Sequence, residues 1–386
     1  MPGGIHPFLI GISRNAVEDL RRRLAATRWP TAVAGSGWAM GMDETYLRWL
    51  ADQWLNHFDW RAIETSLNGH PQFMANIGPS PIHFVHLQGT GPSPIPIILT
   101  HGWPSTYAEL LGLGRVLADP SGNGHEGAPS FDVVIPSLPG YGFSPAPQAL
   151  GTNVFTIADQ WAALMVALGH HRFIAHGGDI GAGVSTALGL RHGDKVLGIH
   201  LNYIPGSYQP FLEPSMALSP EEVQWQALRA AWIDAEGGYA HVQGTKPDVL
   251  GPALNDSPIG LAAWIVDKYR SWSDCDGDLS NCFSSTDLLT VISIYWFTQS
   301  MPSAIRLYWE GRRRPMQLTA GERITVPVAL ARFPKELPTP PRSYVERGYN
   351  VTRWTEFSHG GHFAAMEQTA ALAEDIRTFA AGLRAS

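Results

Sequence analysis

The fold is decided by Gly177-Gly178-Asp179-Ile180-Gly181, which follows the short apolar run 173–175 and precedes a helix-forming stretch. Small residues around a central residue let the backbone turn sharply between a strand and a helix, as in a nucleophile elbow. The residue that such an elbow exposes is here Asp179, where an esterase carries serine. A carboxylate that attacks an sp3 carbon forms an alkyl ester, so we expect a substrate with a strained or activated C–O or C–halogen bond. Helix capping is the other common task of such an aspartate, but the flanking glycines favour the elbow.

Short apolar runs alternate with helical patterns along most of the chain. The runs that we interpret as strands lie at 82–87, 95–100, 133–135, 173–175, 196–201 and 326–333. Helical patterns between them include 107–117 and 157–168. Strands that alternate with helices are typical of a mostly parallel sheet with helices on both faces. The sequence therefore predicts the α/β class and, together with the elbow, the α/β-hydrolase fold.

Two stretches depart from this alternation. Residues 1–81 have helix and loop patterns with many aromatic side chains, so we expect an N-terminal arm packed on the core. Within this arm, Asn15 and Glu18 predict a capping box at the start of the first helix. Residues 204–314 are mainly helical in pattern and are interrupted by proline-containing loops, which predicts an inserted lid. The two parts of the core are expected at 82–203 and 315–386.

The composition is that of a globular protein, with 44% hydrophobic and 16% charged residues. The 27 lysines and arginines against 34 aspartates and glutamates give a net charge of -7, which argues against nucleic acid and anionic membranes as partners. Residues 1–13 lack the features of a secretory signal, and no apolar run suits a spanning helix. Cys275 and Cys282 are too few for a disulfide framework, so we expect a cytoplasmic protein, and their pairing is left open.

In α/β hydrolases the nucleophile is followed along the chain by an acid and then by a histidine. The strand at 326–333 ends shortly before Glu336, which places this carboxylate at the edge of the sheet where ligands bind. Its competitors are the acidic residues Glu322, Glu346 and Glu356. In His359-Gly360-Gly361-His362-Phe363 the glycines suit a tight loop that presents an imidazole. We take His362 as the general base, with His359 as the alternative.

The stretch His101-Gly102-Trp103-Pro104 directly follows the strand at 95–100. In this fold the loop at that place supplies one backbone N–H to an oxyanion hole, and the residue after the nucleophile supplies the other. By position, the two donors are the N–H groups of Trp103 and Ile180. We also expect the side chains of His101 and Trp103 to bind the substrate.

Two other patterns are weaker candidates for functional sites. Ser185 lies among small residues in a pattern that suits a serine esterase, but it falls about two turns into the helix that follows the elbow. A serine at that place cannot sit at the turn. The acidic residues Asp274, Asp276 and Asp278 are similar to a calcium loop, yet Ser285 stands where a bidentate glutamate belongs. We therefore expect a polar loop there and no metal.

Together these motifs resemble those of the α/β-hydrolase epoxide hydrolases, in particular the microsomal type with its N-terminal arm, in a soluble bacterial branch. The motifs are His101-Gly102-Trp103-Pro104, Gly177-Gly178-Asp179, Gly360-Gly361-His362-Phe363, the lid stretches 238–243, 245–248 and 254–258, and Arg28-Trp29-Pro30 in the arm. The resemblance therefore spans nearly the whole chain. There are two departures. We expect no membrane-anchoring helix ahead of the arm, and Ile180 stands where many relatives have tryptophan.

The resemblance implies that two lid tyrosines bind the epoxide oxygen. They correspond to Tyr239 and Tyr308, with Tyr295 as a nearby competitor of Tyr308. It also implies hydrolysis of an epoxide to a vicinal diol, with no cofactor and no metal. Asp179 forms the alkyl ester, and water activated by His362 then hydrolyses it while Glu336 orients the imidazole.

The expected partner is a small-molecule epoxide, in detoxification or in secondary metabolism, and a homodimer is compatible with the sequence. Two other functions stay open. One is a haloalkane dehalogenase that uses the same aspartate nucleophile, and the other is a non-catalytic receptor for a small molecule. The phenols of the lid favour the epoxide, because a departing halide needs N–H donors and Ile180 offers no side-chain donor.

Overall fold

The computed structural model describes residues 4–213 and 216–385, and within these residues nine strands form one sheet. The strand order is β1-β2-β3-β5-β4-β6-β7-β8-β9. The strands are β1 (Ile5–Pro7), β2 (Gln72–Ala75), β3 (Ile82–Leu87), β4 (Ile95–Thr100), β5 (Phe131–Pro136), β6 (Phe173–Gly177), β7 (Val196–Leu201), β8 (Ile324–Arg332) and β9 (Tyr349–Glu356). The pairs from β5 through β4 to β9 are parallel, and β1, β2 and β3 are added antiparallel. The mostly parallel sheet confirms the predicted fold class.

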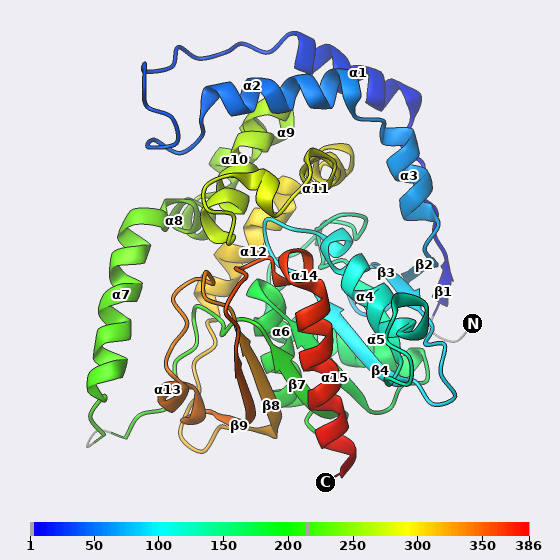
Figure 1. Ribbon diagram of the computed structural model, residues 1–386, viewed down its shortest axis with the longest axis vertical. Helices are drawn as coiled ribbons and strands as arrows, with labels where there is room; N and C mark the ends of the chain where they lie inside the picture. Colours follow the sequence, from blue (N-terminus) through cyan, green and yellow to red (C-terminus); the bar gives the residue numbers. More distant parts are fainter. Residues whose placement is uncertain (1–3, 214–215, 386) are drawn as a thin grey trace.

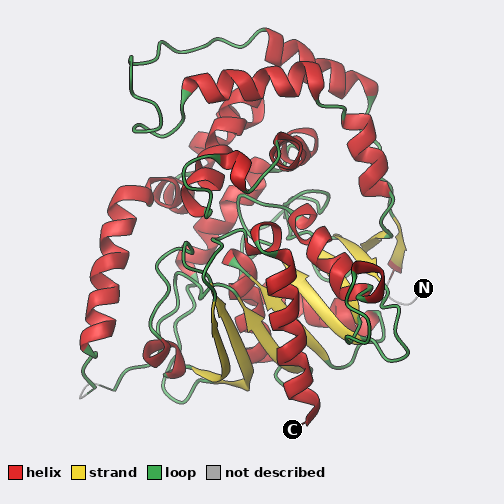
Figure 2. Cartoon of the chain, viewed as in Figure 1, coloured by secondary structure: helices red, strands yellow, loops and turns green. Residues whose placement is uncertain are grey.

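The central strands are buried on both faces, because helices cover each face (Figures 1 and 2). Alternate residues of a strand point to opposite faces, so Ile98 and Ala175 belong to one core while Ile97 and Ile174 belong to the other. The helices α5 (Val154–Ala167) and α6 (Asp179–Arg191) pack on the first of these faces. The helices α4 (Leu111–Ala118) and α15 (Thr369–Ala385) pack on the second. The sheet is thereby held rigid at the strand ends that carry the site.

The chain between β7 and β8 forms helices that lie over one end of the sheet (Figure 1). They are α7 (Pro220–Glu236), α8 (Gly238–Thr245), α9 (Pro247–Asp256), α10 (Pro258–Trp272), α11 (Ser285–Thr298) and α12 (Met301–Arg313). Helix α7 stands apart from the rest, and its buried residue is Glu222. The Glu222 carboxylate accepts from Ser219 N–H in a capping box and pairs with Arg347 at 2.8 Å. Helix α7 is therefore fastened to the core near its first turn.

The N-terminal segment arches over these inserted helices (Figure 1). It contains α1 (Arg14–Ala25), α2 (Glu44–Asp52), a π-helical turn (Gln53–His57) and α3 (Trp60–Asn68). Trp54 Nε1 donates to Ser293 Oγ at 2.9 Å, which ties the segment to α11. The prediction of helix and loop alone was wrong, because β1 and β2 extend the sheet. These strands have only three and four residues, too few to show a period-2 pattern.

The cap of α1 also differs from the prediction. Helix α1 begins at Arg14, and Ser13 is its N-cap, with the hydroxyl accepting from Ala16 N–H at 3.2 Å. The predicted capping box of Asn15 and Glu18 is therefore wrong, because a serine two residues earlier already has the extended backbone that a cap requires.

The remaining short elements are α13 (Arg342–Glu346), α14 (Ala364–Glu367) and three 3-10 turns at Tyr107–Leu110, Ser121–Asn123 and Leu279–Asn281. Among the residues that the structure describes, no helix has the length and apolar character needed to cross a membrane. The two cysteines, Cys275 and Cys282, are free thiols.

Candidate active site

Asp179 sits at the sharp turn between β6 and α6. Its backbone has φ 46, a left-handed conformation that costs a residue with a side chain roughly 1–3 kcal/mol. The turn depends on its glycines, since a Cβ on Gly177 would lie 2.3 Å from the Gly181 backbone. A Cβ on Gly181 would lie 1.9 Å from the Thr100 carbonyl oxygen. The close approach of three backbone segments thus explains why small residues surround Asp179, and it projects the carboxylate beyond the carboxyl edge of the sheet.

Three ionisable side chains from three loops meet at this edge. His362 Nδ1 lies 2.6 Å from Glu336 Oε1, and His362 Nε2 lies 3.6 Å from Asp179 Oδ2. The side chains of His362 and Glu336 are 3% and 1% exposed. Glu336 follows β8, and His362 follows β9, where the His362 N–H donates to Trp272 O at 2.9 Å. The structure therefore brings together the three residues that chain order predicts.

The competing residues lie elsewhere. The side chains of the other glutamates bond to local partners, Glu322 to Thr319, Glu346 to Arg342 and Glu356 to Arg332. The alternative base His359 is exposed, and its Nδ1 lies 2.9 Å from Ser358 Oγ. Among the described residues, Glu336 is therefore the carboxylate that contacts Nδ1 of His362.

Charge dominates the protonation of this group. Burial lowers the pKa of His362, but the negative charge and hydrogen bond of Glu336, with the charge of Asp179, outweigh burial and raise it to about 9. Burial also raises the pKa of Asp179, while the charge of His362 and the backbone N–H groups of Trp103 and Ile180 lower it. At neutral pH the imidazole of His362 is therefore held protonated beside Glu336 and Asp179. Neutralising Asp179 would remove one of the charges that raise the pKa of His362.

The loop after β4 contacts one oxygen of the candidate nucleophile. The Trp103 N–H donates to Asp179 Oδ1 at 2.8 Å. The Trp103 indole points elsewhere, with Nε1 donating to Met301 Sδ at 3.4 Å and its ring stacked on Tyr239 at 5.1 Å. The two oxygens of Asp179 are therefore unlike, because Oδ1 faces a backbone donor and Oδ2 faces His362.

His101 does not support its predicted role as a substrate-binding residue. Its Nδ1 bonds to Gly102 O at 3.0 Å, and its Nε2 accepts from Leu138 N–H at 3.1 Å. Burial lowers the pKa of this imidazole to about 4, so it is neutral. Both ring nitrogens of His101 bond to backbone groups. The ring therefore stabilises the loop and has no nitrogen left to bind a ligand. Sequence position could not reveal in which direction the ring points.

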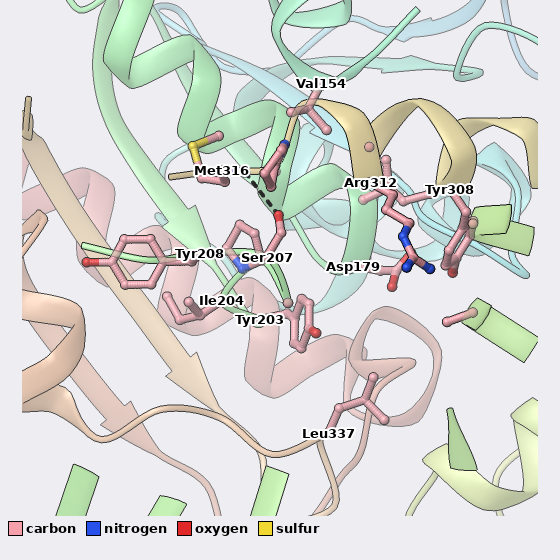
Figure 3. A pocket seen from close by; sticks show the side chains of 18 of the residues that line it. Val154, Asp179, Tyr203, Ile204, Ser207, Tyr208, Tyr308, Arg312, Met316 and Leu337 are labelled. Atoms are coloured by element: carbon pink, nitrogen blue, oxygen red, sulfur yellow. Dashed lines mark hydrogen bonds between the residues drawn. The ribbon is translucent and has the colours of Figure 1, made fainter. Parts of the chain in front are cut away.

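A cavity of about 710 Å³ opens beside Asp179, a size that suits a small molecule (Figure 3). Tyr239 from α8 and Tyr308 from α12 both line it, and their ring centroids are 5.8 Å apart. Burial raises the pKa of each phenol, so both keep their protons. The competitor Tyr295 is fully buried and donates its hydroxyl proton to Ser105 O at 2.7 Å. Tyr239 and Tyr308 are therefore the two predicted phenols that share a cavity with Asp179.

Comparison with known proteins identifies the family. Residues 5–110 match the family described as epoxide hydrolase N terminus, and residues 95–239 match the alpha/beta hydrolase fold. The chain is 34% identical to epoxide hydrolase 1 of the rabbit Oryctolagus cuniculus over 97% of this chain and 88% of the relative. The chain belongs to the epoxide hydrolase family. The predicted resemblance is thus confirmed, including the relationship to the microsomal enzymes.

Other relatives agree. A protein of Stigmatella aurantiaca that carries the provisional name epoxide hydrolase is 40% identical over 99% of this chain and 86% of its own length. Among solved structures, Aspergillus niger epoxide hydrolase superposes with a TM-score of 0.85 at 31% identity, covering 99% of this chain and 97% of that chain. Juvenile hormone epoxide hydrolase of the silkworm Bombyx mori gives a TM-score of 0.84 at 26% identity, covering 99% and 94%.

Several groups near the site of this epoxide hydrolase family member escaped the sequence analysis. The ring centroids of Trp272 and Tyr203 lie 5.1 and 5.8 Å from that of His362, and both rings meet the imidazole edge to face. Tyr203 lies two residues after the end of β7, so the same reasoning from strand ends that selected Glu336 could also have selected Tyr203. Burial raises the pKa of Glu109 to about 7, and the charge of His362 lowers it. Nothing in the local sequence of Glu109 distinguishes it from a surface acid.

The rival patterns have structural tasks in this family member. Ser185 is fully buried in α6, six positions beyond Asp179, away from the turn. The Asp274 carboxylate accepts from Gly360 N–H at 2.8 Å, and the Asp274 N–H donates to Glu367 at 2.7 Å. Asp274 thereby fastens the loop that carries His362.

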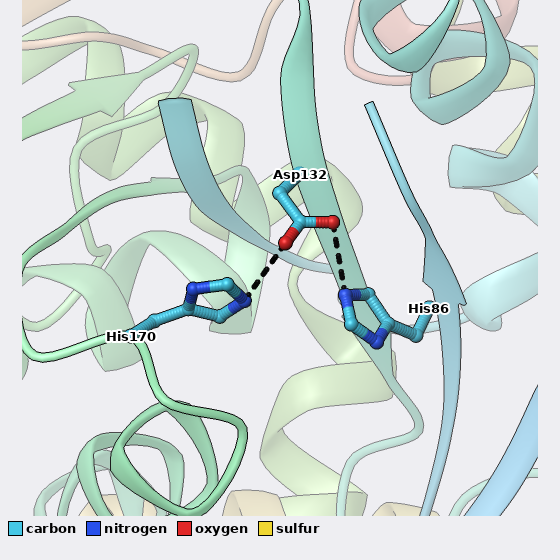
Figure 4. A group of neighbouring side chains, drawn as sticks. All are labelled: His86, Asp132 and His170. Carbon is cyan, nitrogen blue, oxygen red and sulfur yellow. Dashed lines mark hydrogen bonds and ion pairs between the residues drawn. The ribbon is translucent and has the colours of Figure 1, made fainter. Parts of the chain in front are cut away.

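A second ionisable cluster, drawn in Figure 4, lies near the amino ends of the parallel strands β4 and β5. Asp132, near the start of β5, has Oδ1 3.0 Å from His86 Nε2 and Oδ2 3.0 Å from His170 Nε2. Burial raises the pKa of Asp132, but the two histidines outweigh it and hold this pKa well below the usual range. The three ligand-type atoms lie within 4.8 Å of one another. A carboxylate bracketed by two imidazoles joins β3, β5 and the loop before β6, so we interpret the cluster as a structural clamp.

Proposed function

We propose that this chain hydrolyses epoxides to vicinal diols through a covalent ester on Asp179. The observation that carries the proposal is the unlike environment of the two carboxylate oxygens. Oδ1 accepts from the Trp103 N–H, whereas Oδ2 lies 3.6 Å from His362 Nε2. The Asp179 side chain also lines the cavity. One oxygen is thus placed as the future carbonyl oxygen, and the other is free to attack carbon.

In the first step, Asp179 Oδ2 attacks an epoxide carbon from the side opposite the ring C–O bond. That bond breaks, and its electron pair passes to the ring oxygen. Tyr239 and Tyr308 support this step, because their protonated phenols line the same cavity and can donate to the leaving oxygen. An alkoxide is too basic to depart without such donors. The product of the step is an alkyl ester of Asp179.

In the second step, water attacks the ester carbonyl carbon of Asp179 and passes a proton to His362 Nε2. Esterification has removed the charge of Asp179, which lowers the pKa of His362 and makes the neutral base available. Glu336 holds Nδ1 at 2.6 Å and stabilises the imidazolium. The negative charge develops on Oδ1, to which the Trp103 N–H donates, and the Ile180 N–H also acts on this carboxyl group. Each such donor is typically worth about 3–4 kcal/mol. The ester bond then breaks, and the diol oxygen takes the proton from His362. The second proton of the water leaves the Asp179 carboxyl group and replaces the phenol proton that passed to the ring oxygen in the first step.

We also propose that residues 204–314 act as the lid of this site, with 1–81 as the arm and 82–203 and 315–386 as the core. The lid proposal is supported by Tyr239 and Tyr308, which reach the cavity from α8 and α12. The composition, with two free thiols, supports a cytoplasmic location. Subcellular fractionation tests that location, and recovery with secreted proteins would contradict it.

A haloalkane dehalogenase needs side-chain N–H donors for the departing halide. Ile180 has none, and the Trp103 indole N–H is engaged by Met301 Sδ. The phenols therefore favour an epoxide oxygen as the leaving group. The alternative of a non-catalytic receptor is disfavoured by the complete set of Asp179, Glu336 and His362, in which the imidazole bonds to Glu336 at 2.6 Å and lies 3.6 Å from Asp179.

The decisive experiment is a single turnover in water labelled with heavy oxygen. With enzyme in excess over styrene oxide, peptide mass analysis should find one heavy oxygen in the peptide that contains Asp179. The diol should carry none, because its new oxygen comes from the carboxylate. Heavy oxygen in the diol and not in Asp179 would overturn the covalent mechanism. Diol formation by the Asp179→Ala variant would do so as well.

A further inference from the structure

The cavity beside Asp179 has a surplus of positive charge on its walls. Its lining contains three arginines, Arg229, Arg312 and Arg314. Among the described residues that line the cavity, one is acidic, and it is Asp179. The whole chain has a net charge of -7, so a cationic cavity does not follow from the overall composition. The positive charge is therefore a local feature of this cavity.

These arginines are not neutralised by neighbours. Within residues 4–213 and 216–385, none of the three pairs with a carboxylate. Arg229 Nη2 donates to Gly206 O at 2.8 Å, a bond that leaves its charge uncompensated. The Arg314 guanidinium lies 5.0 Å from the ring centroid of Phe155, a neutral partner. A guanidinium has five N–H donors in a planar fork, so each of these side chains keeps donors for an oxyanion.

Exposure distinguishes the cations from the reacting carboxylate. The Asp179 side chain is 15% exposed and lies beside the buried His362. Arg312 and Arg314 are exposed at the end of α12, and Arg229 is half-buried on α7, so these guanidinium groups are the charges of the lining that face solvent most. The rest of the lining is largely apolar and includes Trp232 and Leu307, as well as Ile204, Met316 and Leu337, which Figure 3 labels. An occupant that satisfies this surface has an epoxide at one end, an apolar body and a negative charge at the other.

We propose that this cavity selects epoxides whose apolar body ends in an oxyanion, such as a carboxylate, a sulfate or a phosphate. The inference rests on the proposed epoxide hydrolysis at Asp179 and adds the substrate class. A cleft lined by one sign of charge with apolar walls concentrates ions of the opposite sign and raises their association rate. Arginine forks then bind the oxyanion through paired hydrogen bonds, which fixes the distance of the epoxide from the arginines.

The test compares 9,10-epoxydecanoate with its methyl ester, which differ in the charge at one end. We expect kcat/KM to be about tenfold higher for the acid at low ionic strength, and this preference to shrink as salt screens the arginines. In the triple variant Arg229→Gln, Arg312→Gln, Arg314→Gln, the acid-to-ester ratio should fall to about one. Because the ratio is measured within one variant, a general loss of activity cancels. A phosphate- and a sulfate-terminated epoxide of equal length show whether any oxyanion suffices.

The matched control is Arg313→Gln. Arg313 belongs to the same helix, but it donates to Trp309 O and stacks on the Trp309 ring, outside the cavity lining. This variant should keep the wild-type ratio. Equal turnover of acid and ester by the wild type, or a preference that survives the triple variant, would overturn the inference. Turnover of styrene oxide distinguishes this failure from failure of the proposed function, in which no epoxide is hydrolysed and Asp179 gains no heavy oxygen.

Discussion

Replacing Glu336 by glutamine tests how the protein tunes its base. The substitution keeps the shape of the side chain and removes its charge 2.6 Å from His362 Nδ1. Opposite charges about 4 Å apart at an effective dielectric of about 20 attract by about 4 kcal/mol, equivalent to about 3 pKa units. That attraction is the main influence that holds the pKa of His362 up at about 9 against burial. In Glu336→Gln, the charge of Asp179 still opposes burial, and the pKa of His362 falls toward its ordinary value.

The consequence differs between the two chemical steps. Attack by Asp179 on the epoxide does not use His362 as a base, so alkylation should change little. Hydrolysis of the ester needs a strong and oriented base, and we expect its rate constant to fall by about 10²–10⁴. The covalent ester should therefore accumulate in the variant. Since the pKa of His362 is lower, the acid limb of the kcat profile should move to lower pH.

Rapid acid quench followed by intact-protein mass spectrometry measures the ester, and diol analysis across pH 5–9 measures kcat. Thermal unfolding is the control, because a buried amide without a partner costs about 1–3 kcal/mol of stability. The folded fraction of each preparation normalises the rates. A folded variant with unchanged kcat and no ester build-up would refute the role of Glu336. If the substitution slowed ester formation as much as diol formation, the proposal that His362 acts only in the second step would be refuted.

Three further predictions follow from the geometry. Tyr308→Phe should slow ester formation about tenfold to a hundredfold and leave ester hydrolysis unchanged. Single-turnover mass analysis measures both steps. Equal slowing of the two steps would contradict the role of Tyr308 as a donor to the leaving oxygen. Gly181→Ala should prevent assembly of the elbow, because its Cβ would lie 1.9 Å from Thr100 O, and a wild-type Tm would contradict this. Asp132→Asn should lower Tm at pH 7. Because the folded pKa of Asp132 is depressed, this contribution is fully present above the unfolded pKa of about 4 and is lost progressively as the pH falls below that value toward the lower folded pKa, so the two Tm values should approach each other only in that acid range. A constant difference down to pH 3 would contradict the clamp.

Sequence periodicity located the central sheet closely. The predicted runs at 95–100 and 196–201 coincide with β4 and β7, because buried parallel strands are continuous apolar runs bounded by turn residues. The run at 82–87 coincides with the antiparallel strand β3. The same reasoning failed for β1 and β2. Their sequences, Ile5-His6-Pro7 and Gln72-Phe73-Met74-Ala75, become strands because a neighbouring edge accepts their hydrogen bonds. Pairing with a neighbouring strand makes these two segments extended, and this pairing cannot be seen in their local sequence.

The candidate site divides in a similar way. Chain order and strand ends are enough to bring Asp179, Glu336 and His362 together, since the strands of a parallel sheet end at a common edge. Side-chain direction is a different matter. His101 occupies the expected loop, yet its ring turns to backbone partners. The cationic lining of the cavity was likewise invisible, because Arg229 and Arg312 are distant in sequence and meet only through the packing of the inserted helices.

The antiparallel addition of β1 and β2 bears on where this protein can be cut. The two family matches overlap at residues 95–110, which invites division into an N-terminal piece and a hydrolase piece. The sheet has no such seam, because β2 pairs with β3 along residues 72–75 and 82–85. A truncated chain that began at residue 82 would leave the outer side of β3 with bare amide and carbonyl groups. Such a row is a template for another chain, so the shortened protein should self-associate along that strand.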